Sequence, residues 1–156
     1  MNIELTTRIP QNDDSLAMLL ARLVGVPVRG TLLASQARTA TTSTNAIDGT
    51  GFRGIMVFLN VTTASGTGGL TLFFEHQDPV SGLWAVTAVQ SAAAITTTGL
   101  RPYLAGQGIG LGSNLGAAGA PVFADRGHIL TSAFRLRVTH GDASSYTYSI
   151  GYELIP

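Results

Sequence analysis

The feature that most constrains this fold is a series of short β-branched and aromatic runs that begins at Thr31 and continues to the C-terminus. Clusters of Gly, Asn, Asp and Ser separate the runs, and these residues favour turns. No helical repeat lies between the runs to carry the chain across parallel strands. The pattern predicts an all-β fold, an antiparallel β-sandwich or jelly roll. The predicted strands cover residues 31–44, 54–63, 70–77, 83–89, 94–104, 134–140 and 146–154.

Alternation within the predicted strands indicates which side chains face the core, because successive side chains of a strand point to opposite faces. In residues 134–140 the apolar residues Phe134, Leu136 and Val138 alternate with Arg135 and Arg137. We therefore expect the two arginines on an exposed or interfacial face, where they would bind carboxylates of a neighbouring subunit. The residues predicted to face inward in two further strands are Ile55, Val57, Leu59, Val61, Tyr146, Tyr148, Ile150 and Tyr152.

The aromatic residues leave two interpretations open. Trp84 follows a turn and begins a predicted strand, so we expect it to pack between the sheets. Most of the tyrosines, among them Tyr103, are expected in the core as well. Exposed aromatic rings on a flat face or in a groove would instead favour a carbohydrate-binding adhesion module.

Residues 1–30 form a segment of different character, predicted to be an N-terminal arm that carries one short amphipathic helix. Asp13 or Asp14 caps this helix, and Gly25 with Pro27 ends it. A helix of about ten residues is too short to be stable alone in water, so its apolar side must bind the body or a neighbouring subunit. The predicted contact residues of the arm are Ile3, Leu5, Ile9, Leu16, Leu19, Leu20 and Leu23.

The predicted β-sandwich domain, residues 31–156, contains a glycine-rich loop at 105–123. Its apolar residues Ile109, Leu111 and Leu115 indicate either an assembly contact or a flexible loop. A dinucleotide-binding motif is not expected, because its third glycine would fall at Leu111 and no βαβ unit surrounds it.

Composition excludes several kinds of chemistry. All nine basic residues are Arg, so lysine-dependent catalysis is excluded, and the absence of Cys excludes thiolate chemistry. His76, His128 and His140 are scattered, and His140 with Asp142 and Ser144 is more simply explained as a hairpin turn. We therefore expect no enzymatic activity, metal or cofactor.

Charge and hydropathy also limit the partners. The net charge is zero and no basic cluster is present, so nucleic-acid binding is not expected. No apolar run has the length of a membrane span, and the first residues lack a signal-peptide pattern. Charged residues make up 12% of the chain, about half the usual share. A surface with so little charge favours binding to other proteins.

Four segments combine strand and turn patterns, namely GIMVFLNVT at 54–62, DPVSGLW at 78–84, FRLRVTHGD at 134–142 and YSIGYEL at 148–154. In this order they resemble small structural proteins of tailed bacteriophages, the head decoration (cement) proteins. The resemblance implies a β-sandwich or jelly roll made in the host cytoplasm and located on the capsid exterior. Its implied partners are the major capsid protein and further copies of itself, a homotrimer being favoured over a homodimer. It brings no catalytic residues, and another head or tail component remains an alternative.

Overall fold

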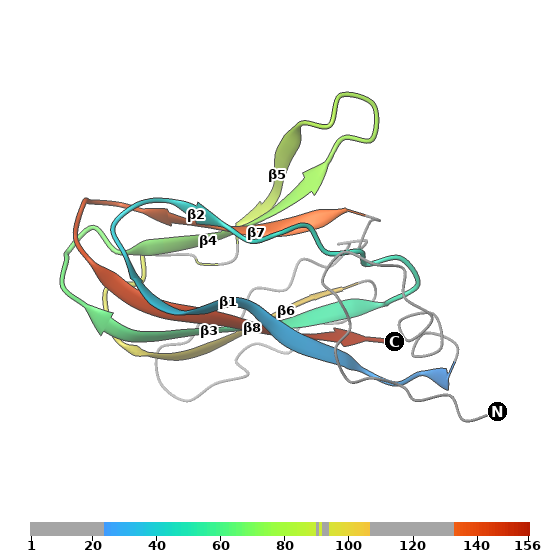
Figure 1. Ribbon diagram of the computed structural model, residues 1–156, viewed down its shortest axis with the longest axis horizontal. Coiled ribbons are helices and arrows are strands. Elements are labelled where there is room, and N and C mark those ends of the chain that lie inside the picture. The colour runs from blue at the N-terminus through green and yellow to red at the C-terminus, as the bar shows by residue number, and fades with distance from the viewer. Residues whose placement is uncertain (1–23, 90, 92–93, 107–132) are drawn as a thin grey trace.

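The computed structural model describes residues 24–89, 91, 94–106 and 133–156. These residues form two antiparallel four-stranded sheets, which appear as two layers in Figure 1. The prediction of an all-β, sandwich-like fold is confirmed. The first sheet has the order β1 (Val28–Arg38), β8 (Tyr146–Ile155), β3 (Gly54–Ala64) and β6 (Gly99–Gly106). The second has the order β2 (Thr42–Ser43), β7 (Phe134–His140), β4 (Leu70–Gln77) and β5 (Trp84–Val89).

The strand pairs are nested within one another along the chain. The first strand pairs with the last, β2 with β7, β3 with β6 and β4 with β5. Two further pairings, β3 with β8 and β4 with β7, join the nested pairs into two sheets. The chain therefore changes sheet at nearly every connection, which brings distant segments together around one core.

The core lies between the two sheets and consists of the apolar side chains that alternate inward. Nearly all of the predicted inward-facing residues are fully buried, and only Tyr152 is partly exposed. Removing this apolar surface from water stabilises the fold by roughly 25 cal/mol per Å². The second sheet contributes the fully buried residues Leu70, Leu72, Phe74, Phe134, Leu136 and Val138.

The largest departure from the predicted strands is near the N-terminal end of the described chain. Residues 31–44 were expected as one strand, but they divide between β1 and β2. The division follows from the pairing, since β1 joins β8 in the first sheet whereas β2 joins β7 in the second. β1 also begins at Val28, within the predicted arm, and β6 covers Gly99–Gly106, whereas the prediction was 94–104.

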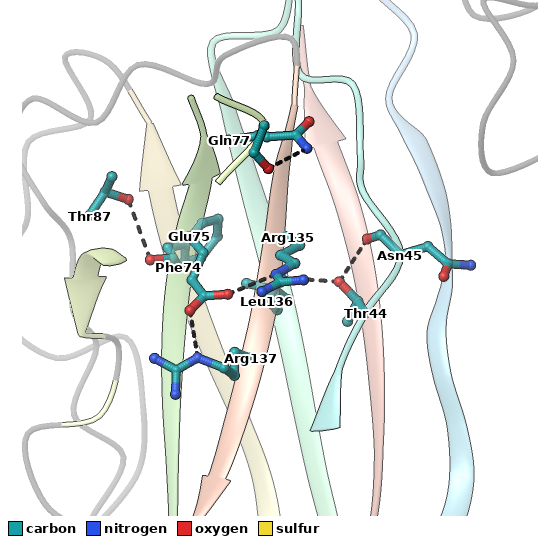
Figure 2. Close-up of polar contacts among 10 residues, drawn as sticks. Thr44, Asn45, Phe74, Glu75, Gln77, Thr87, Arg135, Leu136 and Arg137 are labelled. Carbon is teal, nitrogen blue, oxygen red and sulfur yellow. Dashed lines mark hydrogen bonds and ion pairs between the residues drawn. The ribbon is translucent and has the colours of Figure 1, made fainter. Parts of the chain in front are cut away.

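Side-chain hydrogen bonds from Thr44 fix the position of β7, the strand that carries the predicted arginine face. The Leu136 amide donates to Thr44 Oγ1 at 3.1 Å, and this hydroxyl donates to the Asn45 carbonyl at 2.9 Å (Figure 2). The Thr44 amide donates to the Leu136 carbonyl at 2.8 Å. The segment after β2 therefore continues the antiparallel pairing with β7. Together with β4 on the other side, this pairing fixes which side chains of β7 face inward and which face outward.

Candidate functional site

The outer face of the second sheet holds a buried ion cluster formed by Glu75, Arg135 and Arg137, here called the Arg–Glu–Arg cluster. Glu75 on β4 lies opposite Arg135 on β7 in the pairing register. Its Oε2 accepts a hydrogen bond from Arg135 Nε at 2.7 Å, and its Oε1 accepts one from Arg137 Nε at 2.5 Å. Figure 2 shows the carboxylate between the two guanidinium groups. Both arginines alternate outward on β7, as predicted, but the carboxylate that they bind is Glu75 of the same chain, whereas one from a neighbouring subunit was expected.

The electrostatics of this cluster follow from the burial of its carboxylate. The side chain of Glu75 is only 5% exposed, while each arginine side chain is 25% exposed. Burial is the largest single influence on the pKa of Glu75 and would raise it. The hydrogen bonds and charges of Arg135 and Arg137 together outweigh burial and hold the pKa below its ordinary value. At neutral pH the cluster has two positive charges and one negative charge, a net charge of +1.

Aromatic rings lie against both guanidinium groups. The Arg135 guanidinium carbon lies 4.2 Å from the centre of the Trp84 ring, and that of Arg137 lies 4.8 Å from the centre of the Phe73 ring. Cation–π contacts of this kind hold the planar guanidinium group in one orientation. Each guanidinium group is therefore held by Glu75 and by one aromatic ring, and the cluster is organised before any partner binds.

The β4–β5 hairpin projects from the body next to this cluster, at the upper right of Figure 1. The predicted turn at 78–82 is confirmed. Asp78 Oδ1 accepts from the Val80 amide at 3.0 Å, its Oδ2 accepts from the Ser81 hydroxyl at 2.5 Å, and its carbonyl accepts from the Gly82 amide at 2.8 Å. Gly82 has φ of +71°, a left-handed conformation that glycine adopts without strain. The hairpin therefore holds its shape through contacts of its own.

Exposed apolar side chains are concentrated on this hairpin. Val80 is 94% exposed, Leu83 is 70% exposed and Val86 is 47% exposed. Among the described residues six large apolar side chains are exposed, so half of them lie on one short hairpin. Grouped exposed apolar side chains are typical of protein-binding sites, whereas scattered ones are ordinary. The hairpin and the Arg–Glu–Arg cluster are the strongest candidate for a functional site in the described chain.

The expectation that Trp84 packs between the sheets is wrong. Trp84 lies opposite Gln77, whose side of β4 faces outward, and its ring contacts the outward-facing Arg135. It is partly exposed and is not a core residue. The pairing of β4 with β5 also shifts register between Phe74 and Glu75, and such an irregularity bends the strand and changes the direction of the hairpin. By contrast, Tyr103, Tyr146 and Tyr148 are buried, as expected.

The other polar group noted in the sequence, around His140, is a structural turn. The predicted hairpin at 141–145 is confirmed, and Asp142 accepts from the Gly68 amide at 2.6 Å and from the Ser144 amide at 2.9 Å. His140 Nε2 lies 3.4 Å from the Tyr148 hydroxyl. Burial lowers the pKa of His140 below its ordinary value. In the part of the chain that the structure describes, no three His, Asp or Glu residues are placed to bind one metal ion.

Many of the predicted contact residues lie outside the described residues. These are the arm positions Ile3, Leu5, Ile9, Leu16, Leu19, Leu20 and Leu23 and the loop positions Ile109, Leu111 and Leu115. The predicted short helix of the arm and His128 also lie outside the described residues. Of the expected glycine-rich loop, the described positions Ala105 and Gly106 belong to β6. A helix long and apolar enough to cross a membrane does not occur in the described ranges.

No protein-family model matches the chain, and no curated protein matches its sequence.

Proposed function

We propose that the two sheets form a jelly roll. A jelly roll results when one long hairpin of nested antiparallel pairs is rolled so that its strands form two facing sheets. The nesting of β1 with β8, β2 with β7, β3 with β6 and β4 with β5 supports this assignment. So do the sheet orders β1-β8-β3-β6 and β2-β7-β4-β5.

From this architecture we infer a non-enzymatic virion structural protein that binds the outside of a tailed-phage capsid. It reinforces contacts between subunits of the major capsid protein, and it does so as a homo-oligomer, with a trimer favoured over a dimer. The strand order is the observation that carries the proposal, because virus structural proteins commonly use eight-stranded jelly rolls. The resemblance of four of its segments to decoration proteins supports the same assignment.

The physical effect of such a protein follows from mass action. A protein that binds only the assembled shell stabilises it by RT ln(1 + [L]/Kd), about 2.7 kcal/mol per site at a concentration 100-fold above Kd. The low charged fraction of 12% suits a surface that is buried in an assembly.

The predicted arm forms a second contact in this proposal. The described fold begins after the arm's leucines, since β1 starts at Val28. Deleting residues 1–23 is therefore expected to leave both sheets folded while weakening capsid binding. Unchanged binding by this variant would remove the arm from the proposal.

Co-sedimentation tests the proposal directly. The purified chain is mixed with undecorated capsids assembled from the major capsid protein of the same phage, and its mass in solution is measured by light scattering. We expect a trimer that pellets with capsids and saturates at a fixed ratio to the major capsid protein. A protein that stays in the supernatant at every concentration would refute capsid binding.

A carbohydrate-binding adhesion module is the second candidate, and the position of Trp84 favours it. The ring is partly exposed on an outer face, where aromatic platforms for sugars are found, although Arg135 covers one side of it. A glycan array probed with the wild-type chain and with Trp84→Ala separates the two functions. Glycan binding that depends on Trp84, together with no capsid binding, would favour the adhesion module.

A further inference from the structure

We propose that the projecting β4–β5 hairpin and the Arg–Glu–Arg cluster form one docking surface for a protein segment that presents a carboxylate between apolar side chains. The carboxylate binds the terminal nitrogens of Arg135 and Arg137, and the apolar neighbours pack on the hairpin. This inference names the chemistry of the partner, and it rests on the proposed function only in taking the capsid as that partner.

Charge is the first reason for a carboxylate. Glu75 neutralises one of the two guanidinium charges, so the cluster itself keeps a net charge of +1. The bonds to Glu75 use the Nε atoms of Arg135 and Arg137. Each guanidinium group therefore retains its terminal nitrogens, and their N–H groups match the geometry of a carboxylate.

Preorganisation is the second reason. Glu75 fixes each guanidinium group from one side, and the rings of Trp84 and Phe73 support them from another. A flexible arginine loses side-chain entropy on binding, at a cost of about 0.5–1.5 kcal/mol for each immobilised side chain. Here folding has already restricted both side chains, so a partner carboxylate meets a site with little entropy left to lose.

The exposed apolar side chains define the rest of the partner segment. Val86 lies opposite Glu75 in the pairing register and therefore on the same face of the sheet as the cluster. Val80 and Leu83 extend the apolar surface to the end of the hairpin. A binding site with aromatic and arginine residues beside apolar contacts has the composition of an interface centre.

A second copy of the described chain is a poor source of this carboxylate. Five acidic residues lie in the described ranges, and four of them already accept hydrogen bonds from their surroundings. Asp78, the nearest to the hairpin end, has both of its oxygens bound within its own turn. The fifth, Glu153, lies on β8 in the other sheet, so from the described residues we take a different protein as the source of the carboxylate. The acidic residues already bound are Asp48, Glu75, Asp78 and Asp142.

A paired substitution at one exposed position tests the charge argument. Leu83→Asp and Leu83→Lys remove the same apolar side chain at a site that is 70% exposed, but they add opposite charges next to Trp84, whose ring contacts Arg135. We expect Leu83→Asp to bind at least about tenfold more weakly than Leu83→Lys, because a like charge repels the partner carboxylate. The matched control is Leu100→Asp, at a 60% exposed apolar residue on the other sheet, which should bind as the wild type does.

Two probes keep this test separate from the proposed function. The first is a synthetic peptide array in which Asp or Glu, flanked by Leu, Val or Phe, is compared with the same peptides carrying Asn or Gln. The second is the undecorated capsid. We expect the wild type to prefer the acidic peptides, and Leu83→Asp to lose both this preference and capsid binding. Failure of the wild type to bind capsids would refute the proposed function alone, and the array would still decide the docking surface.

Either of two results would refute the docking surface. Equal binding to acidic and amide peptides would refute the carboxylate, whatever the capsid result. Equal capsid affinities for Leu83→Asp and Leu83→Lys would do the same. Thermal unfolding of each variant, with midpoints within about 2 °C of the wild type for these exposed positions, shows that lost binding is not lost folding.

Discussion

Two hairpin turns of this chain use the same residue types and reach opposite structural outcomes. The turns at 78–82 and 141–145 are both rich in Gly, Asp and Ser, and in both an aspartate accepts amide hydrogen bonds. Asp78 bonds only to its own turn, and its hairpin projects from the body. Asp142 also accepts from Gly68, in the loop between β3 and β4. The residue types of a turn thus determine its local shape. Whether the turn packs against the body or projects from it depends on the contacts that it makes with other segments.

The close packing around the second turn makes the same point. The Tyr146 hydroxyl accepts from the Gly69 amide at 2.8 Å, and the Gly141 amide donates to the Gly69 carbonyl at 2.9 Å. At the first turn, by contrast, Val80 is almost fully exposed. We infer that the turn at 141–145 contributes to stability and the turn at 78–82 to recognition.

The largest expected effect comes from adding one carbon atom at Gly68, which packs against the turn at 141–145, compared with the same change at Gly82 in the turn at 78–82. In Gly68→Ala the new Cβ would lie 2.5 Å from the Gly141 carbonyl carbon and 2.7 Å from the Asp142 amide nitrogen, so backbone must move. We expect a loss of about 3 kcal/mol in the free energy of unfolding, measured by urea denaturation. Gly82→Ala meets nothing nearer than 3.8 Å and loses only about 1 kcal/mol, from its positive φ. Equal losses would contradict the distinction between the turns.

Replacing the aspartate of each turn should give the next largest difference in stability between the two turns. Asp142→Ala leaves the Gly68 amide without its acceptor, so we expect a clearly lower urea midpoint than the wild type has. Asp78→Ala affects only the exposed turn that it belongs to and should shift the midpoint far less. If the Asp78 variant were the less stable of the two, the projecting hairpin would have to be part of the cooperative fold.

A smaller difference should appear in the pH dependence of stability, because His140 lies beside the anchored turn. Burial lowers its folded pKa below the ordinary value of 6.5. The unfolded chain then binds the proton more tightly, so this contribution to stability is present above pH 6.5 and is lost as the pH falls toward the folded pKa. His140→Gln should flatten the stability profile in that window. An unchanged slope from pH 6.5 downward would show that His140 is not its cause.

The smallest expected effect is at the end of the projecting hairpin. Val80→Ser and Leu83→Ser should change the free energy of unfolding by no more than about 0.5 kcal/mol, since both side chains are exposed when folded and unfolded. The measurement is again urea denaturation, beside the binding assays. A larger loss of stability would mean that these side chains pack within the protein, and the hairpin would no longer be a free surface.

The inward and outward sides of most strands could be predicted from the sequence, because alternation is a local property. Phe134, Leu136 and Val138 are buried as predicted, and Arg135 with Arg137 face outward. The division of 31–44 into two strands could not be predicted in this way. It depends on which distant strand each half pairs with, and the local pattern contains no such information.

The candidate site shows the same limit. Glu75 was not predicted as the partner of the arginines, because its position opposite Arg135 depends on the register between β4 and β7. Trp84 was placed wrongly since its strand, WAVTAV, contains no polar alternation that would identify its outer face. A partial signal for Glu75 existed, as it is a charged residue at the outward position of a strand with buried Leu70, Leu72 and Phe74.

The nesting of the strand pairs also determines the order in which the chain can fold. The innermost pair, β4 with β5, closes over a short turn, whereas the outermost pair, β1 with β8, joins nearly the two ends of the described chain. The entropy of closing a loop rises with its length, and folding slows when contacts are distant in sequence. The β4–β5 hairpin should therefore form early and the β1–β8 pair late. In that order, the surface proposed to bind a partner is shaped before the first and last strands close the fold.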